Sequence, residues 1–303
     1  MSRVAGGRVR PRNEQSTCVV DAASHAENEF VMATTDTGVN FSFNRVAAMV
    51  RRYWYLLRSS WPRILDLIYW PAVQMLMWGF LQLYISQNAG FFARAGGVFI
   101  GSVLLWDILF RGQLGFSISF LEEMYARNLG NLMMSPLRPS EFLVSLMIMS
   151  IVRLSIGMIP VSILAIAFFG FNLWALGLAL AAFFANLILT SWAVGIFVAG
   201  LLLRNGLGAE SMAWTIMFLF LPLTCVYYPV AVLPEWLQYF AWALPPTYVF
   251  EGMRALVIDH VFRADLMAQG FALNIVMFAG ASLAFLMLLR SARVQGSLLQ
   301  TSE

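Results

Sequence analysis

Six long apolar runs, separated by shorter polar stretches, fill most of the chain after residue 40. Each run has about twenty residues or more, which as a helix is enough to cross the roughly 30 Å hydrocarbon core of a bilayer. The pattern predicts an all-α, polytopic membrane protein with six transmembrane helices. Their approximate bounds are Ile64–Ile85, Gly96–Phe120, Phe142–Phe169, Leu173–Leu203, Met212–Val232 and Leu266–Leu289.

Residues 41–60 have a different pattern, in which apolar and basic positions recur with a helical period. The apolar stripe consists of Val46, Met49, Val50, Tyr53, Trp54 and Leu57, and the basic side of Arg45, Arg51, Arg52 and Arg58. We expect an amphipathic helix that lies in the membrane interface with its arginines toward anionic headgroups. Trp61, Pro62 and Arg63 then turn the chain into the first span.

Residues 122–141 are the one long polar interruption among the first four apolar runs. A helix over Glu122–Met134 would place Tyr125, Leu129, Leu132 and Met133 on one stripe and Glu123, Arg127 and Asn131 on the other. Glu123 and Arg127 stand four residues apart, so we expect them to pair. Ser135 and Pro136 end this helix, and Pro139 suits the start of the next. Such a helix either docks a soluble partner or is an interfacial loop helix with no partner.

Residues 233–265 are amphipathic and aromatic, and Pro234, Pro245 and Pro246 interrupt them. Two short helices fit, one after Pro234 and one after the double proline. They predict a re-entrant pair that dips into the membrane, which is tolerated only where protein buries the broken backbone.

The layout of the charges gives an orientation. Only 12% of the residues are charged, against roughly 25% in a soluble domain, and all 19 basic residues are arginine. Arginines gather before the first span, in residues 122–141, in the turn at residues 204–210 and after the last span, whereas Arg94 and the mixed charges of residues 233–265 lie on the other side. Because short cytoplasmic loops are rich in basic residues, both termini and residues 122–141 are expected to be cytoplasmic. Residues 1–40 are expected to be a disordered tail and residues 294–303 a short polar tail.

Three charged residues fall inside the predicted spans. Asp107 and Arg111 stand four apart and can pair, and Arg153 lies about 16 Å into the third span. Because a charge at mid-membrane is costly, such residues face protein or water. They either line a transport pathway or form ion pairs that fix the packing of helices, and we favour ion pairing.

No pattern of catalytic residues occurs. Cys18 and Cys225 have no metal-ligand spacing, and His25 and His260 are isolated. A phosphate-binding loop that ends in lysine is impossible, since the chain has no lysine. We therefore expect neither an enzyme nor a metal or cofactor site in this chain. The basic pI reflects topology and is no sign of nucleic-acid binding.

Two stretches resemble the ABC-2 type permeases of ATP-binding-cassette exporters. In residues 226–257 the matching positions are Pro229, Pro234, Trp236, Leu237, Pro245, Thr247, Tyr248 and Arg254. In residues 122–141 they are Glu122, Glu123, Arg127, Leu132, Ser135, Pro136, Leu137 and Glu141. Residues 41–60 are similar to the elbow helix of that family. Leu223-Thr224-Cys225 departs from the Ser-Gly that many members carry in the fifth span.

The resemblance implies a permease subunit that forms a pore with a second copy or a related subunit. Separate ATPase subunits, which bind ATP and Mg²⁺, would dock on a cytoplasmic coupling helix with Glu122, Glu123, Arg127, Asn131, Ser135 and Pro136 as contact residues. The implied place is a bacterial inner membrane. The expected cargo is a small amphipathic or lipid-like molecule. The alternatives are a polysaccharide or glycolipid exporter, and a membrane scaffold or embedded enzyme with no ATPase.

Overall fold

The computed structural model describes residues 41–88 and 96–295. The tail predicted at residues 1–40, Arg94, Cys18 and His25 lie outside the described residues. So does the tail predicted at residues 294–303, apart from its first two residues, which end the last helix.

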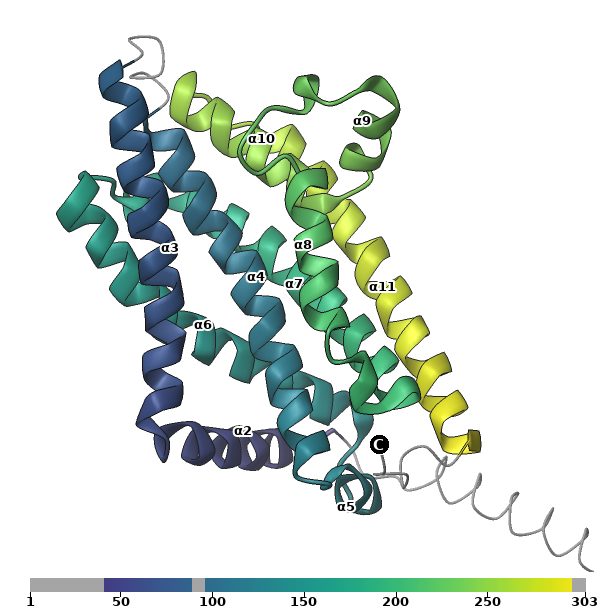
Figure 1. Ribbon diagram of the computed structural model, residues 1–303. Coiled ribbons are helices and arrows are strands. Elements are labelled where there is room, and N and C mark those ends of the chain that lie inside the picture. The colour runs from purple at the N-terminus through teal and green to yellow at the C-terminus, as the bar shows by residue number, and fades with distance from the viewer. Residues whose placement is uncertain (1–40, 89–95, 296–303) are drawn as a thin grey trace, which may run out of the picture. The chain divides into compact units, whose positions relative to one another are not determined.

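Helices account for nearly all of the described residues, and no strand occurs among them (Figure 1). The α-helices are α2 (Phe43–Arg58), α3 (Trp61–Asn88), α4 (Gly96–Tyr125), α5 (Leu129–Met134), α6 (Pro139–Phe169), α7 (Leu178–Asn205), α8 (Met212–Leu223), α9 (Glu235–Trp242), α10 (Pro245–Ile258) and α11 (Ala264–Gln295). Short 3-10 helices are η2 (Leu173–Leu176), η3 (Gly206–Ala209) and η4 (Val230–Val232). The all-α prediction is confirmed for this part of the chain.

Five described helices are long and apolar enough to cross a membrane, namely α3, α4, α6, α7 and α11. The predicted fifth span is wrong in its extent. Its helix, α8, ends at Leu223 after 12 residues, which is about 18 Å and shorter than the hydrocarbon core. Beyond Leu223 the chain turns, and Cys225 takes a left-handed conformation with φ of 53°. The count of six crossings stays a prediction.

The fourth apolar run is also not one continuous helix. It opens with η2, capped by the Asn172 side chain, which accepts a hydrogen bond from the Trp174 amide. Gly177, with φ of 54°, then allows the chain to change direction before α7 begins.

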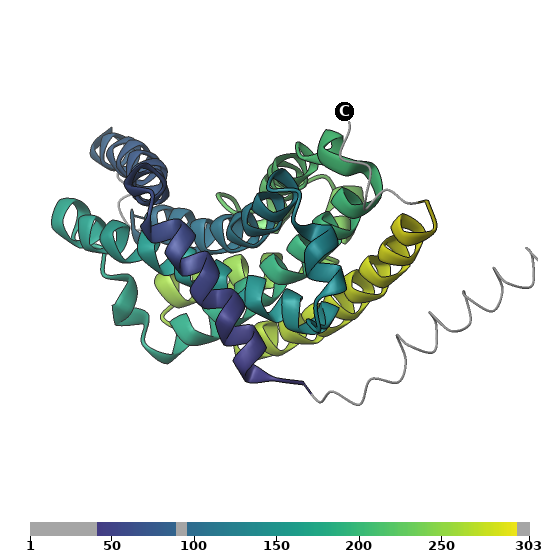
Figure 2. The same cartoon turned by 90° about the horizontal axis from the view of Figure 1, so that it is seen from below.

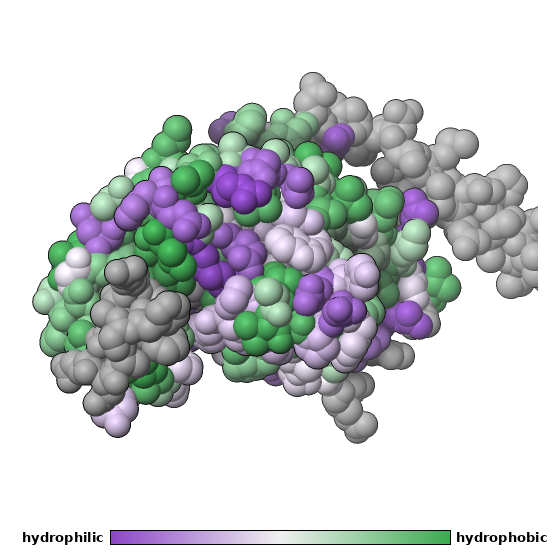
Figure 3. All heavy atoms as spheres, turned by 90° about the horizontal axis from the view of Figure 1, so that it is seen from above, coloured by the Kyte–Doolittle hydropathy of each residue, from purple (hydrophilic) through white to green (hydrophobic). Residues whose placement is uncertain are grey.

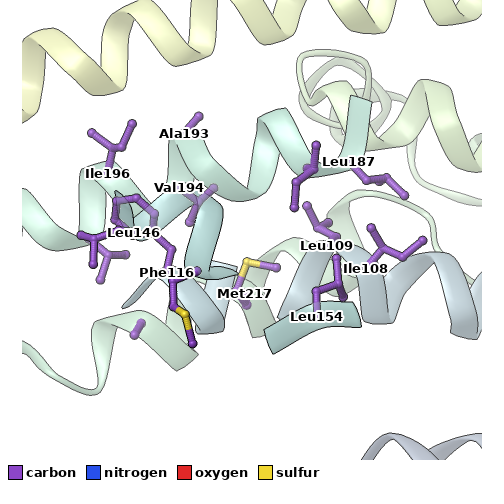
Figure 4. Close-up of a cluster of buried hydrophobic side chains, with 14 of the residues drawn as sticks. Ile108, Leu109, Phe116, Leu146, Leu154, Leu187, Ala193, Val194, Ile196 and Met217 are labelled. Carbon is purple, nitrogen blue, oxygen red and sulfur yellow. The ribbon is translucent and has the colours of Figure 1, made fainter. Parts of the chain in front are cut away.

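The hydrophobic core lies where α4, α6, α7 and α8 meet. Figure 4 shows a cluster to which α4 contributes Leu109 and Phe116, α6 Leu146, α7 Val194 and α8 Met217, all of them buried. Glycines permit close approach between helices. A Cβ on Gly157 of α6 would lie 2.7 Å from the carbonyl oxygen of Leu67 on α3.

The two segments predicted to lie on opposite sides of a membrane lie at opposite ends of the helix bundle. Helix α2 runs across one end, and α5 lies at the same end (Figures 1 and 2). Helices α9 and α10 lie at the other end, where the surface mixes hydrophilic with hydrophobic residues (Figure 3). The candidate functional site is at the end that carries α2 and α5.

Candidate functional site

The predicted helix over Glu122–Met134 is wrong, because the segment divides into the last turn of α4 and the separate helix α5. Helix α4 continues to Tyr125 and ends in a pair of backbone hydrogen bonds, Asn128 N to Glu123 O and Arg127 N to Met124 O, both 3.0 Å. This is a Schellman motif, and its left-handed position is occupied by Arg127, with φ of 53°. The turn therefore separates Glu122 and Glu123 from α5.

The expected ion pair between Glu123 and Arg127 does not form. The Glu123 carboxylate, buried at the end of α4, accepts two hydrogen bonds from Arg52 of α2, at 2.6 and 3.1 Å, and one from Asn128 Nδ2 at 2.8 Å. A bidentate arginine contact is stronger and more directional than a single bond. Glu123 therefore attaches α2 to α4.

Two further carboxylates bind arginines in the same region. Glu122 accepts from Arg153 Nη2 of α6 at 2.8 Å and from Arg63 Nη1 of α3 at 3.2 Å. Glu141, fully buried near the start of α6, accepts from Arg45 Nε of α2 at 2.8 Å and from its own cap amide, Arg138 N, at 3.0 Å. We call Glu122, Glu123, Glu141 and the arginines that bind them the carboxylate lattice. It joins α2, α3, α4 and α6.

Helix α2 is amphipathic as predicted, but its apolar stripe faces protein. Val46, Met49, Tyr53 and Leu57 are buried in the bundle. Of its four arginines, Arg45 and Arg52 point inward to Glu141 and Glu123 and not toward headgroups, which corrects the prediction. Arg51 and Arg58 are exposed.

Tyr53 adds a buried polar atom to the contact between α2 and α4. Its side chain is fully buried and its hydroxyl has no hydrogen-bond partner in the described structure. Burial, together with the nearby Glu123 carboxylate, raises the pKa of Tyr53 well above its ordinary value. The phenol is therefore held in its neutral form.

Helix α5 keeps one face on the bundle and presents the other. Leu129 is buried and Leu132 packs against the core, whereas Met133 has no described side chain. Ser135 closes the helix as predicted, with its hydroxyl donating to the Leu132 carbonyl at 2.7 Å. Arg127, Asn131, Met134 and Pro136 are exposed, and Met134 is 81% exposed. We call these four residues the α5 surface.

Arg127 has no ion pair with any residue of the described part of the chain. Beside it, the Tyr125 hydroxyl hydrogen-bonds the Glu210 carboxylate, just after η3. This contact links the end of α4 to the start of α8. The turn at Arg127 is therefore fixed before it by Tyr125 and after it by Asn128, which donates to Glu123.

The charges within the spans do not form one cluster. Arg153 belongs to the carboxylate lattice through Glu122. Asp107 Oδ1 lies 3.6 Å from Arg111 Nε, so these two residues pair as predicted, but neither Asp107 oxygen makes a hydrogen bond among the described residues. Whether either residue lines a pathway stays a prediction.

At the opposite end, the proline-interrupted segment forms the predicted pair of short helices. Pro234 precedes α9 and Pro245 begins α10. Arg254 of α10 donates to the Cys225 carbonyl at 2.9 Å and pairs with Glu251, which in turn accepts from the Val230 amide at 2.8 Å. Tyr248 packs edge-on against Trp242, and Trp236 is 65% exposed. Arg254 and Glu251 therefore hold the chain that leads from α8 to α9.

Sequence reasoning missed the carboxylate lattice. The sequence assigns Glu122 and Glu123 to a docking contact, gives Glu141 only as a position that matches the family, and does not single out Glu251. The available signal was the number of arginines in residues 45–63, since buried carboxylates require cations or amide donors nearby. Among the described residues, no group of three His, Cys, Asp or Glu side chains could hold a metal ion.

Comparison with known families gives one match. The family model described as ABC-2 type transporter matches residues 45–258, from the first turn of α2 to the end of α10. No curated protein matches the sequence.

Proposed function

Because the chain belongs to the ABC-2 type transporter family, we propose that it is the membrane permease subunit of an exporter in a bacterial inner membrane. It works with a second permease subunit and with separate ATPase subunits that bind ATP and Mg²⁺. Both termini of the chain are cytoplasmic, as is the end of the bundle that carries α2 and α5.

The α5 surface is the docking site for the ATPase. The observation that carries this proposal is a contrast within one short segment. Leu129 and Leu132 anchor α5 on the bundle, while Arg127 and Met134 are exposed and Arg127 has no ion pair with any described residue. An exposed cation beside an exposed methionine suits a protein groove with an acidic rim and an apolar floor. Asn131 and Pro136 complete the contact.

The carboxylate lattice has a different role from the docking role expected for its acids. Glu122 and Glu123 are already bound by arginines of α2, α3 and α6, so they position the docking site without contacting the ATPase. Through these contacts, a displacement of α4 or α5 by the ATPase is passed to α2, α3 and α6. Ion pairs across helices are suited to this, since the helices can move only together while the pairs last.

The pathway lies among the membrane helices, and the segment from α9 to α10 closes its outer side. We favour a small amphipathic or lipid-like cargo, because the spans are apolar and rich in aromatic residues. Asp107, Arg111 and the exposed rings of Trp214 and Phe218 are the residues to test for contact with cargo.

The test is affinity purification of the full chain from its native membrane in mild detergent, followed by mass spectrometry. We expect an ATPase subunit in stoichiometric amount with the wild type and its loss with Arg127→Glu. The matched control is Arg263→Glu, which reverses an exposed arginine between α10 and α11 at the opposite end of the bundle. An equal yield of ATPase with Arg127→Glu, or no ATPase with the wild type, contradicts the proposal.

A further inference from the structure

A groove lies between α7, α8 and α11, away from the carboxylate lattice and the α5 surface. It has a volume of about 360 Å³, near the lower end of the range for small-molecule pockets. Its walls include Val194 and Phe197 of α7, Ile216 and Phe220 of α8, and Met277 and Gly280 of α11.

No polar side chain lines the groove. Every lining residue has an apolar side chain or is glycine, and the residues stand within helices whose backbone donors and acceptors bond internally. A ligand with hydroxyl, amide or charged groups would lose their hydration without compensation. The groove therefore selects hydrocarbon.

Its depth along the bundle excludes a headgroup as well. Gly280 lies 16 residues after the start of α11 and 15 before its end, about 24 Å and 22 Å along the helix axis. Helices α7 and α11 are both long and apolar enough to span a membrane. The groove thus opens near the middle of the hydrocarbon layer, where only the distal part of an acyl chain is present.

The surface around the groove is continuous with the membrane-facing surface of the spans. Ile275, Val276, Leu283 and Met287 on α11 are exposed and apolar, as is Leu219 on α8. At Gly280 itself, an added Cβ would meet no atom within 4 Å. The missing side chain is what leaves the groove open.

We propose that this groove is a binding site for the acyl chain of a bilayer phospholipid, with Gly280 as the residue that keeps it open. The chain lies between α7 and α11 and packs against Phe197, Phe220 and Met277. The site takes its occupant from the bilayer, and the inference does not depend on the identity of the ATPase or the cargo.

Two substitutions provide a matched test. Gly280→Leu adds a side chain inside the groove, whereas Ala279→Leu adds one at the neighbouring exposed position of α11, which does not line the groove. At residue 280 leucine favours a helix more than glycine does, and a Cβ there would meet no atom within 4 Å. Residue 279 is exposed, so both variants should fold.

The full chain of each variant is reconstituted into phosphatidylcholine vesicles in which some lipid carries a diazirine near the end of one acyl chain. After illumination, labelled residues are mapped by mass spectrometry. We expect labelling of Phe197, Phe220 and Met277 in the wild type and in Ala279→Leu, and its loss at these residues in Gly280→Leu. Labelling of the open face at Val276 and Leu283 should be unchanged in all three.

Equal labelling of the groove residues in Gly280→Leu overturns the proposal, and so does labelling confined to the open face of α11. A third outcome is protection of the groove by a second copy of the chain. In that case a cysteine placed at residue 280 would form a disulfide-linked dimer, and the acyl-chain assignment would be wrong.

Discussion

Single residues at the contact between α2 and α4 have distinct energetic roles. The Glu123 carboxylate is 1% exposed and is bound by an arginine and an asparagine. The neighbouring Tyr53 hydroxyl is buried and makes no hydrogen bond to any described residue. Removing a hydrogen-bond donor from the Glu123 carboxylate should therefore lower the free energy of unfolding, whereas removing the Tyr53 hydroxyl should raise it.

Arg52→Ala leaves the buried Glu123 carboxylate with Asn128 as its remaining hydrogen-bond donor. We expect a loss of about 2 kcal/mol in the free energy of unfolding, since the carboxylate loses two charged hydrogen bonds. Arg51→Ala, one position along α2 and exposed, should change stability by less than about 0.5 kcal/mol. Thermal unfolding in detergent micelles measures both, and equal effects would show that Arg52 contributes no more than a surface arginine.

Tyr53→Phe should stabilise the protein by about 1 kcal/mol, because it removes an unsatisfied buried hydroxyl. It should also change the response to alkali. The pKa of Tyr53 is raised in the folded protein, so above about pH 10 the phenol ionises in the unfolded chain and stays neutral in the folded one. Stability is thus full below pH 10 and falls as the pH rises further.

Unfolding temperatures at pH 8 and pH 11 test whether stability falls at alkaline pH as predicted. The wild type should lose more stability between the two values than Tyr53→Phe does. An identical loss in both proteins would mean that Tyr53 ionises normally in the folded state.

At the scale of elements, close helix contacts and the segment between α8 and α10 are the features that depend on particular side chains. Gly157→Ala places a methyl group 2.7 Å from the Leu67 carbonyl oxygen and should push α6 away from α3. We expect destabilisation by about 1–3 kcal/mol. The matched glycine is Gly280, where alanine meets no atom within 4 Å and should be neutral or stabilising by up to about 1 kcal/mol. Unfolding of both variants under one condition measures the difference, and similar values would refute the close contact.

Arg254→Met removes the contacts that hold the chain between α8 and α9. The Val230 amide donates to Glu251, which Arg254 orients, so we expect faster hydrogen exchange at Val230 and along residues 225–233. Arg263→Met, which removes an exposed arginine paired with Asp265, is the control. Unchanged exchange at Val230 would mean that α10 holds this segment without Arg254.

At the scale of the whole molecule, the apolar runs predicted the order and approximate positions of the five long helices among the described residues, because crossing a bilayer depends on length and hydropathy. They overestimated the fifth run, whose helix α8 has only 12 residues. The end of α5 at Ser135 and the starts of α6 at Pro139 and of α10 at Pro245 could be predicted, because proline restricts the backbone locally. Interruptions that depend on backbone geometry were missed. Nothing in the sequence marks the left-handed Arg127 or Cys225, where glycine would be usual.

The carboxylate lattice could not be derived from sequence because its pairs join positions far apart. Glu141 and Arg45 are 96 residues apart, and Glu123 and Arg52 are 71 residues apart. Local spacing predicts an ion pair between Glu123 and Arg127. In the structure, Glu123 is instead bound by Arg52, which is distant in the sequence. The exposed residues of the proposed docking surface could nonetheless be predicted, since Arg127 and Asn131 follow from the polar face of the segment and Pro136 from the resemblance to the family.

If an ATPase docks on the α5 surface, a photoreactive group placed on that surface will cross-link to it. A photoreactive group is attached to a cysteine at Met134, which is 81% exposed, or at Leu129, which is 7% exposed on the same helix. Cys18 and Cys225 are first replaced by serine and alanine, respectively. After illumination in native membranes, we predict that the group at residue 134 cross-links to a subunit carrying an ATP-binding motif and that the group at residue 129 does not. Cross-links from residue 134 to lipid alone, or none to such a subunit, would contradict the account.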